Sequence, residues 1–196
     1  MNSTASSLAP SLLSEAESQQ ARLYIEQARD GLIGATRLLT QAQWEFQPRT
    51  DRWSVEQIVA HVIAVQERVI ARLQQGFAEA PAPPKEQDCQ TVDNIVINQF
   101  PNRLTRFPSP IPPERGLDRQ AAVDRYVENC AVLFRILTST SGLREHALDS
   151  PPLKAVSKGA YLVMDGYQWI LAAAAHAERH TKQILEVIAD GAFPLQ

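Results

Sequence analysis

The sequence predicts an all-α protein, a four-helix bundle with one long crossover connection between its second and third helices. Four long stretches carry apolar residues at helical spacing, and no stretch of similar length alternates as a strand would. The connection between the second and third stretches is longer than the other two. At 196 residues the chain suits one substantial core, so we expect residues 14–196 to form one domain after a flexible segment over residues 1–13.

The first two helices are predicted over residues 14–41 and 54–74. Apolar side chains recur at mostly helical spacing in the first range, with good helix formers between them. The second range opens with Ser54, and Gln57 follows three residues later. This spacing is typical of a capping box, in which two side chains satisfy free backbone N–H groups at the start of a helix.

A proline-rich connection and the last two helices follow. Residues 76–116 hold eight of the thirteen prolines, which excludes an uninterrupted helix and leaves room for a short one around Asn94. The third helix is predicted over residues 118–142 and the fourth over residues 165–190, each opened by an aspartate that can act as N-cap. The long connection allows the second and third helices to run parallel.

Composition argues against several classes of partner. The net charge is −3, and no run of Lys and Arg interleaves with aromatic residues, so nucleic acid is not expected as a partner. The longest apolar run, WILAAAA, is too short to cross a bilayer, and the first residues lack the features of a signal peptide. Cys89 and Cys130 lie far apart without C-x-x-C spacing, which argues against a disulfide framework or a thiolate zinc site. We expect a cytoplasmic protein that acts on a small molecule and contacts neither nucleic acid nor membrane.

Three of the four histidines lie on predicted bundle helices. His176 and His180 are four residues apart, so both imidazoles lie on one helix face and could bind one ion. His61 lies among apolar residues of the second helix, where burying an imidazole is costly unless both nitrogens are satisfied. A metal ion would help to satisfy it, but so would a hydroxyl or carbonyl partner, and the other two histidines could equally be solvated. Periodicity alone leaves these alternatives open.

Other residues of chemical interest have structural interpretations. Trp53 and Trp169 are expected to anchor the core, and Asp165 to cap its helix. His146 follows the third helix and is expected to be exposed in a loop. No general base is evident, so the sequence assigns no catalytic residue.

Two fragments resemble the signature stretches of the DinB-like superfamily. They are DRWSVEQIVAHVIAVQER, a Trp-Ser turn into a helix with one histidine, and MDGYQWILAAAAHAERHTKQILEVI, a helix ending in H-x-x-R-H-x-x-Q-I. The likeness covers most of the chain and extends weakly to RLTRFPSPIPPERG and LREHA. It implies a four-helix bundle in which His61, His176 and His180 bind one divalent metal, whether Zn, Ni, Fe or Mn, and in which homodimers are frequent.

The superfamily that these fragments resemble includes bacillithiol transferases and relatives described as metal-dependent hydrolases. Three neutral imidazoles leave open positions on a divalent ion, which is the arrangement of a catalytic site, and such an ion lowers the pKa of a bound water or thiol. The resemblance favours transfer of a low-molecular-weight thiol, as co-substrate, to an electrophilic substrate. A hydrolase, or a bundle that binds a metal or ligand without turnover, remains the alternative.

Arg103 and Arg106 are candidate substrate-binding residues in the proline-rich connection. A guanidinium can pair bidentately with a carboxylate group of the thiol. A plain surface arginine is the simpler interpretation of each.

Overall fold

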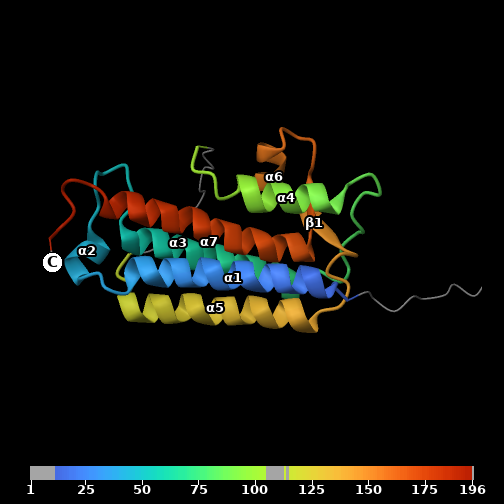
Figure 1. The fold of residues 1–196 in the computed structure, drawn as a ribbon, viewed down its shortest axis with the longest axis horizontal. Coiled ribbons are helices and arrows are strands. Elements are labelled where there is room, and N and C mark those ends of the chain that lie inside the picture. The colour runs from blue at the N-terminus through green and yellow to red at the C-terminus, as the bar shows by residue number, and fades with distance from the viewer. Residues whose placement is uncertain (1–11, 105–112, 114, 196) are drawn as a thin grey trace, which may run out of the picture.

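The computed structural model describes residues 12–104, 113 and 115–195, and it confirms the predicted all-α four-helix bundle (Figure 1). Most of the N-terminal segment expected to be flexible therefore lies outside the described residues. The bundle consists of four long helices: α1 (Glu15–Thr36), α3 (Val55–Gln74), α5 (Arg119–Ser139) and α7 (Gly166–Ile188). The shorter elements are α2 (Gln41–Glu45), α4 (Cys89–Gln99), β1 (Ala147–Asp149), α6 (Pro151–Val156) and β2 (Val163–Asp165).

The four long helices form a closed ring of neighbours. α1 and α3 each pack against both α5 and α7. α3 and α5 run in one direction, whereas α1 and α7 run in the other (Figure 1). Since α3 and α5 are parallel, the chain between them has to return along the bundle, and it does so through α4, which packs against α7. The predicted long crossover, with its short helix near Asn94, is confirmed.

The later bundle helices begin at the caps that the sequence indicates. The backbone N–H of Gln57 donates to Oγ of Ser54 at 3.2 Å, and the N–H of Ser54 donates back to Oε1 of Gln57 at 3.1 Å. Asp118 and Asp165 likewise accept from backbone N–H groups three residues ahead, at 2.9 and 2.8 Å. Each cap satisfies N–H groups that have no partner within their own helix.

The predicted first helix is too long. α1 ends at Thr36, and a separate helix, α2, begins after Thr40. Thr40 and Gln43 form a capping box of their own, because the hydroxyl of Thr40 accepts from the N–H of Gln43 at 3.3 Å. The apolar pattern of the sequence continues across this change of direction, and no proline or glycine marks it. The sequence alone therefore does not show that one helix ends and another begins here.

The connection before α7, where the sequence predicts a loop around His146, contains β1, α6 and β2. The two strands pair antiparallel, with Ala147 opposite Asp165. Each strand has only three residues, so an alternating pattern cannot be recognised in the sequence. α6 opens with a proline after Ser150, whose Oγ accepts from the backbone N–H of Leu153 at 3.2 Å. A proline is well suited to this first helical position.

α7 is the most extensively buried of the four long helices. It packs against α1, α3, α4 and α5, and the four alanines at residues 172–175 are all buried. The apolar run WILAAAA thus belongs to the centre of the bundle, where small side chains let neighbouring helices approach closely. Among the described helices, none has both the length and the apolarity required to cross a bilayer.

We predict that Gly166→Ala destabilises the start of α7. A Cβ at this position would lie 2.7 Å from Cδ2 of Leu143 and 2.7 Å from Cζ of Phe77. Both neighbours are buried and have little room to move aside. Overpacking of this kind typically costs about 1–3 kcal/mol, which urea denaturation would measure as a lower free energy of unfolding.

Gly34→Ala is the matched control. Apart from its chain neighbours and the adjacent backbone of α1, no heavy atom of the described residues lies within 4 Å of the Cβ that alanine would add at this position. Because alanine favours a helix over glycine by about 1 kcal/mol, this variant should be as stable as the parent or more so. Equal effects at the two glycines would contradict the packing described around Gly166.

Candidate metal centre

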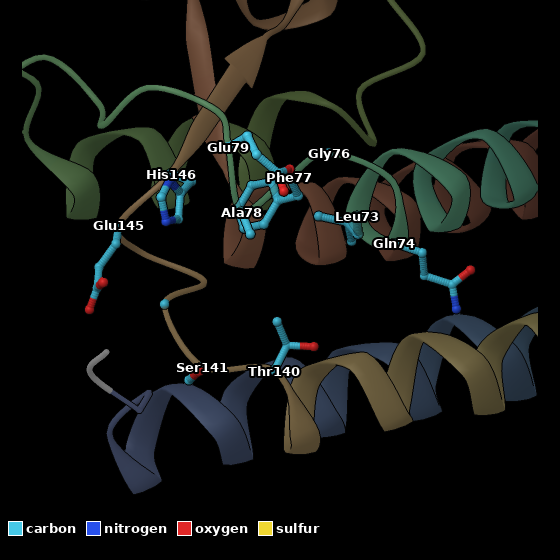
Figure 2. A pocket seen from close by; sticks show the side chains of 11 residues that line it. Leu73, Gln74, Gly76, Phe77, Ala78, Glu79, Thr140, Ser141, Glu145 and His146 are labelled. Atoms are coloured by element: carbon cyan, nitrogen blue, oxygen red, sulfur yellow. The ribbon is translucent and has the colours of Figure 1, made fainter. Parts of the chain in front are cut away.

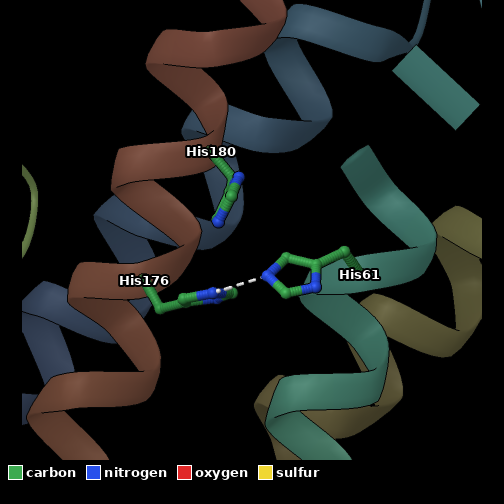
Figure 3. Close-up of side chains that lie close together, drawn as sticks. All are labelled: His61, His176 and His180. Atoms are coloured by element: carbon green, nitrogen blue, oxygen red, sulfur yellow. Dashed lines mark hydrogen bonds between the residues drawn. The ribbon is translucent and has the colours of Figure 1, made fainter. Parts of the chain in front are cut away.

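Three histidines from two helices converge between α3 and α7 (Figure 3). His61 projects from α3, and His176 and His180 project from successive turns of α7. Nε2 of His61 lies 3.1 Å from Nε2 of His176, and one ligating nitrogen from each of the three residues lies within 4.8 Å of the other two. Because α3 and α7 are neighbours in the bundle, residues 115 positions apart in the chain meet here.

The separations between these nitrogens suit one divalent ion. Two bonds of about 2.1 Å place their nitrogens about 3.0 Å apart at a right angle and about 3.4 Å apart at a tetrahedral angle. The 3.1 Å between His61 and His176 falls between these values. A pair of nitrogens at the 4.8 Å limit would have to close by about 1.4 Å to reach the tetrahedral separation. Side-chain rotations of that size would let all three nitrogens bind one ion.

The polar contacts of His61 and His176 differ from those of ordinary core histidines. Nε2 of His61 faces another imidazole instead of a hydroxyl or carbonyl, so one of the two facing nitrogens must carry a proton unless both bind an ion. Nδ1 of His176 is buried and has no hydrogen-bond partner among the described residues. Leaving a buried polar atom unpaired costs free energy, so the cluster is not explained by satisfied hydrogen bonding alone.

Burial lowers the pKa of all three imidazoles. It lowers the pKa of His61 to about 4, with the charge of Arg68 as a second cause. It lowers the pKa of His180 to about 3, with His61 as a second cause, and it brings the pKa of His176 well below its usual range. All three rings are therefore neutral near pH 7, and a neutral imidazole is the form that binds metal.

Sequence reasoning did not assign two residues that lie beside the cluster. Nδ1 of His180 lies 2.8 Å from Oε1 of Gln183, which follows it by three residues on the same helix face. The ring of Trp53 lies 5.0 Å from the ring of His61 and 6.4 Å from that of His180. Trp53 thus contributes an apolar wall to the site in addition to packing on the core. The available signals were the H-x-x-Q spacing and the position of Trp53 just before the N-cap of α3.

The end of the crossover contacts α7 close to the histidines. Arg179, which precedes His180, donates to the backbone carbonyl of Asn102. Arg103 pairs with Glu186 at 2.9 Å and donates to Gln183 at 3.1 Å. Its side chain is 24% exposed, so Arg103 is not a freely solvated arginine.

The structure describes only one of the two arginines predicted to bind substrate. Arg103 lies near the cluster, and its role in substrate binding stays a prediction. Arg106 lies outside the described residues.

His146 is not at the cluster, and it is less exposed than predicted. It is partly buried, and its Nδ1 lies 2.6 Å from the carbonyl oxygen of Ala80. It lines a cavity of about 260 Å³ at the ends of α3 and α5 (Figure 2). Leu73, which also lines that cavity, is twelve residues beyond His61, or about 18 Å along the helix axis. The cavity and the histidine cluster are therefore separate.

The candidate ligand set contains only imidazoles. Within the described part of the chain, no carboxylate or thiol joins His61, His176 and His180 to enlarge the group. A divalent ion held by three neutral ligands keeps its full positive charge and has positions open to other ligands.

The sequence matches a known family over most of its length. Residues 24–184 match the profile of the DinB superfamily. The chain belongs to the DinB superfamily. Its structure is similar to that of YfiT from Bacillus subtilis, with a TM-score of 0.61 and 13% sequence identity, over 92% of this chain and 91% of that one. No curated protein matches the chain.

The comparison with YfiT concerns the fold. YfiT is described as "a probable metal-dependent hydrolase with an unusual four-helix bundle topology". At 13% identity the likeness shows that this DinB superfamily member shares the bundle, and the description of activity applies to YfiT. The chain is thus a DinB superfamily protein with a three-histidine cluster that can hold a metal ion.

Proposed function

We propose that this DinB superfamily protein is a metal-dependent enzyme that transfers a low-molecular-weight thiol to an electrophilic substrate. The observation that carries the proposal is the all-histidine ligand set, without a carboxylate among the described residues within reach of all three rings. When bound, a divalent ion supplies a Lewis acid that lowers the pKa of a thiol or water beside it.

Thiol transfer suits this set of side chains better than hydrolysis does. A thiol has a pKa of about 8.5, so a modest shift gives a thiolate at neutral pH without a protein base. Hydrolysis of an amide also needs a group that delivers a proton to the leaving nitrogen. The three histidines are neutral and serve as ligands, so they are poorly suited to that task.

The chain's own residues would bind and orient the reactants. His61, His176 and His180 would hold the ion, and Trp53 would limit the access of water on one side of the cluster. Arg103 and Arg106 remain candidates for binding carboxylate groups of the thiol, because a guanidinium offers paired donors.

A metal-dependent hydrolase is the second candidate. It is favoured by the fold shared with YfiT, which is described as a hydrolase of that kind. A bundle that binds metal without turnover is the third, since a fold does not determine an activity.

Conjugation of a thiol to an electrophile is expected to need both metal and thiol. The metal-loaded protein should be incubated with bacillithiol, mycothiol, glutathione or coenzyme A and with a haloarene or epoxide. We expect conjugate with at least one thiol, and we expect chelation to abolish it because the thiolate is then no longer favoured near neutral pH. Mass spectrometry of the conjugate measures the result.

Two outcomes of these assays would favour the hydrolase or the binding protein over the transferase. Ester or amide hydrolysis without any conjugate would replace the transferase with the hydrolase. Inactivity in both assays, with metal bound, would favour the binding protein.

A further inference from the structure

One side-chain oxygen links the crossover to the candidate metal centre. Oε1 of Gln183 lies 2.8 Å from Nδ1 of His180 and 3.1 Å from Nη1 of Arg103. Arg103 is itself held by Glu186, with Nε donating at 3.1 Å and Nη2 at 2.9 Å. The chain of contacts therefore runs from Glu186 through Arg103 and Gln183 to His180.

The chemistry of Arg103 determines the orientation of the groups beyond it. A guanidinium has N–H donors and no acceptor, so the amide of Gln183 must present its oxygen to Arg103 and not its NH₂ group. The same oxygen faces Nδ1 of His180, so Nδ1 must carry the proton. In a neutral imidazole the other nitrogen then has the free lone pair. Nε2 of His180 is thereby left as the nitrogen able to bind a metal.

We propose that Arg103 and Gln183 are positioning residues that set the tautomer and ring orientation of His180 and thereby the affinity of the cluster for a divalent metal. This inference rests on the metal site of the proposed function, but not on the thiol reaction. It gives the crossover a role at the metal centre without direct contact with the ion.

The alternative orientation explains why this contact matters. Without Arg103, the amide of Gln183 could turn and present its NH₂ group to Nδ1 of His180. Nδ1 would then accept, and the ring proton would lie on Nε2, where it competes with a metal. Partners that fix the tautomer of a ligating histidine typically contribute about 10–100-fold to metal affinity.

The first test is the affinity of Gln183→Leu for Zn²⁺, measured without thiol by competition with a chromophoric chelator. Leucine is close in size to glutamine but offers no acceptor. We expect binding to weaken by about 10–100-fold, with helical content unchanged by circular dichroism. Gln183→Glu keeps an oxygen and has no NH₂ group to turn, so it should bind at least as tightly as the parent.

The second test removes Arg103 together with Glu186. Replacing Arg103 alone would change the net charge near a cation, so the double variant Arg103→Gln/Glu186→Gln keeps the net charge constant. We expect it to lose up to about tenfold in Zn²⁺ affinity, because Gln183 is no longer held. In a Gln183→Leu background the same pair of changes should alter the affinity by less than about twofold, since Arg103 acts through Gln183.

The control is the corresponding pair on another face of the bundle. Arg125 on α5 pairs with Glu67 on α3 at 2.6 Å, and Arg125→Gln/Glu67→Gln should leave Zn²⁺ affinity unchanged. Parental affinity in Gln183→Leu, equal losses in the test and control pairs, or a parent that binds no Zn²⁺ would each overturn the inference. Failure of conjugation with these affinity differences intact would instead count against the proposed reaction alone.

Discussion

His176→Ala is expected to lose tight binding of divalent metal while keeping its helical fold. Two histidines, His61 and His180, would remain, and two ligands rarely hold an ion in a protein. We expect affinity to fall by more than the roughly 100-fold that outer partners contribute, since a direct ligand is removed. Metal content after purification and the far-UV circular dichroism spectrum measure the two parts of the prediction.

The expectation that the fold survives has a structural reason. Nδ1 of His176 is buried without a partner among the described residues, so removing the ring also removes an unsatisfied polar atom. This gain opposes the loss of packing that any truncation of a buried side chain causes. His146→Ala is the control, because the fourth histidine lies outside the cluster and its loss should leave metal binding unchanged. Global unfolding of His176→Ala would instead make the ion a structural one.

Features set by neighbouring residues could be predicted from the sequence. The caps at Ser54 and Asp165 each involve residues three apart, and the pair His176 and His180 depends only on helical spacing. Whether this pair lies close to His61 depends on which helix faces pack together. The spacing of apolar residues does not determine those faces. Resemblance to a family supplied the missing information.

Contacts between distant segments could not be predicted. Arg103 and Gln183 are 80 positions apart, and nothing in either local sequence indicates that one meets the other. The same holds for Arg144, whose hydrogen bond to Glu17 spans 127 positions. Such contacts follow from the path of the crossover and of the loop before α7, which contain many prolines and little periodic pattern.

Arg144 joins three carboxylates at the end of the bundle where α7 begins. Its guanidinium lies 2.8 Å from Glu17, 2.6 Å from Asp93 and 2.9 Å from Asp165, and it stacks on the ring of Tyr167 at 4.1 Å. These partners come from α1, α4, β2 and α7. The arginine side chain is only 18% exposed, so solvent screens these pairs weakly.

Arg144→Met is expected to lower the free energy of unfolding by about 3–5 kcal/mol near neutral pH. Methionine has similar length, but it leaves buried carboxylates without a counter-charge, and breaking a buried ion pair in this way typically has an effect of this size. Arg125→Met removes the more exposed partner of Glu67 and should change stability by about 1 kcal/mol or less. Urea denaturation of the two variants and the parent measures the difference.

The loss caused by Arg144→Met should grow as pH rises. Burial raises the pKa of Asp165 to about 6 in the parent, although Arg144 opposes that rise. Without the guanidinium, the folded-state pKa of Asp165 moves higher still, while its unfolded value stays near 3.9. A carboxyl whose folded pKa is raised contributes stability that is lost as pH rises through that value. In the parent this loss is therefore nearly complete above pH 6. In the variant, whose Asp165 has a higher folded pKa, the free energy of unfolding continues to fall above pH 6. Unfolding at pH 6 and pH 8 should therefore show a wider gap between parent and variant at pH 8. An equal gap at both pH values would mean that Arg144 acts by packing on Tyr167 and not by its charge.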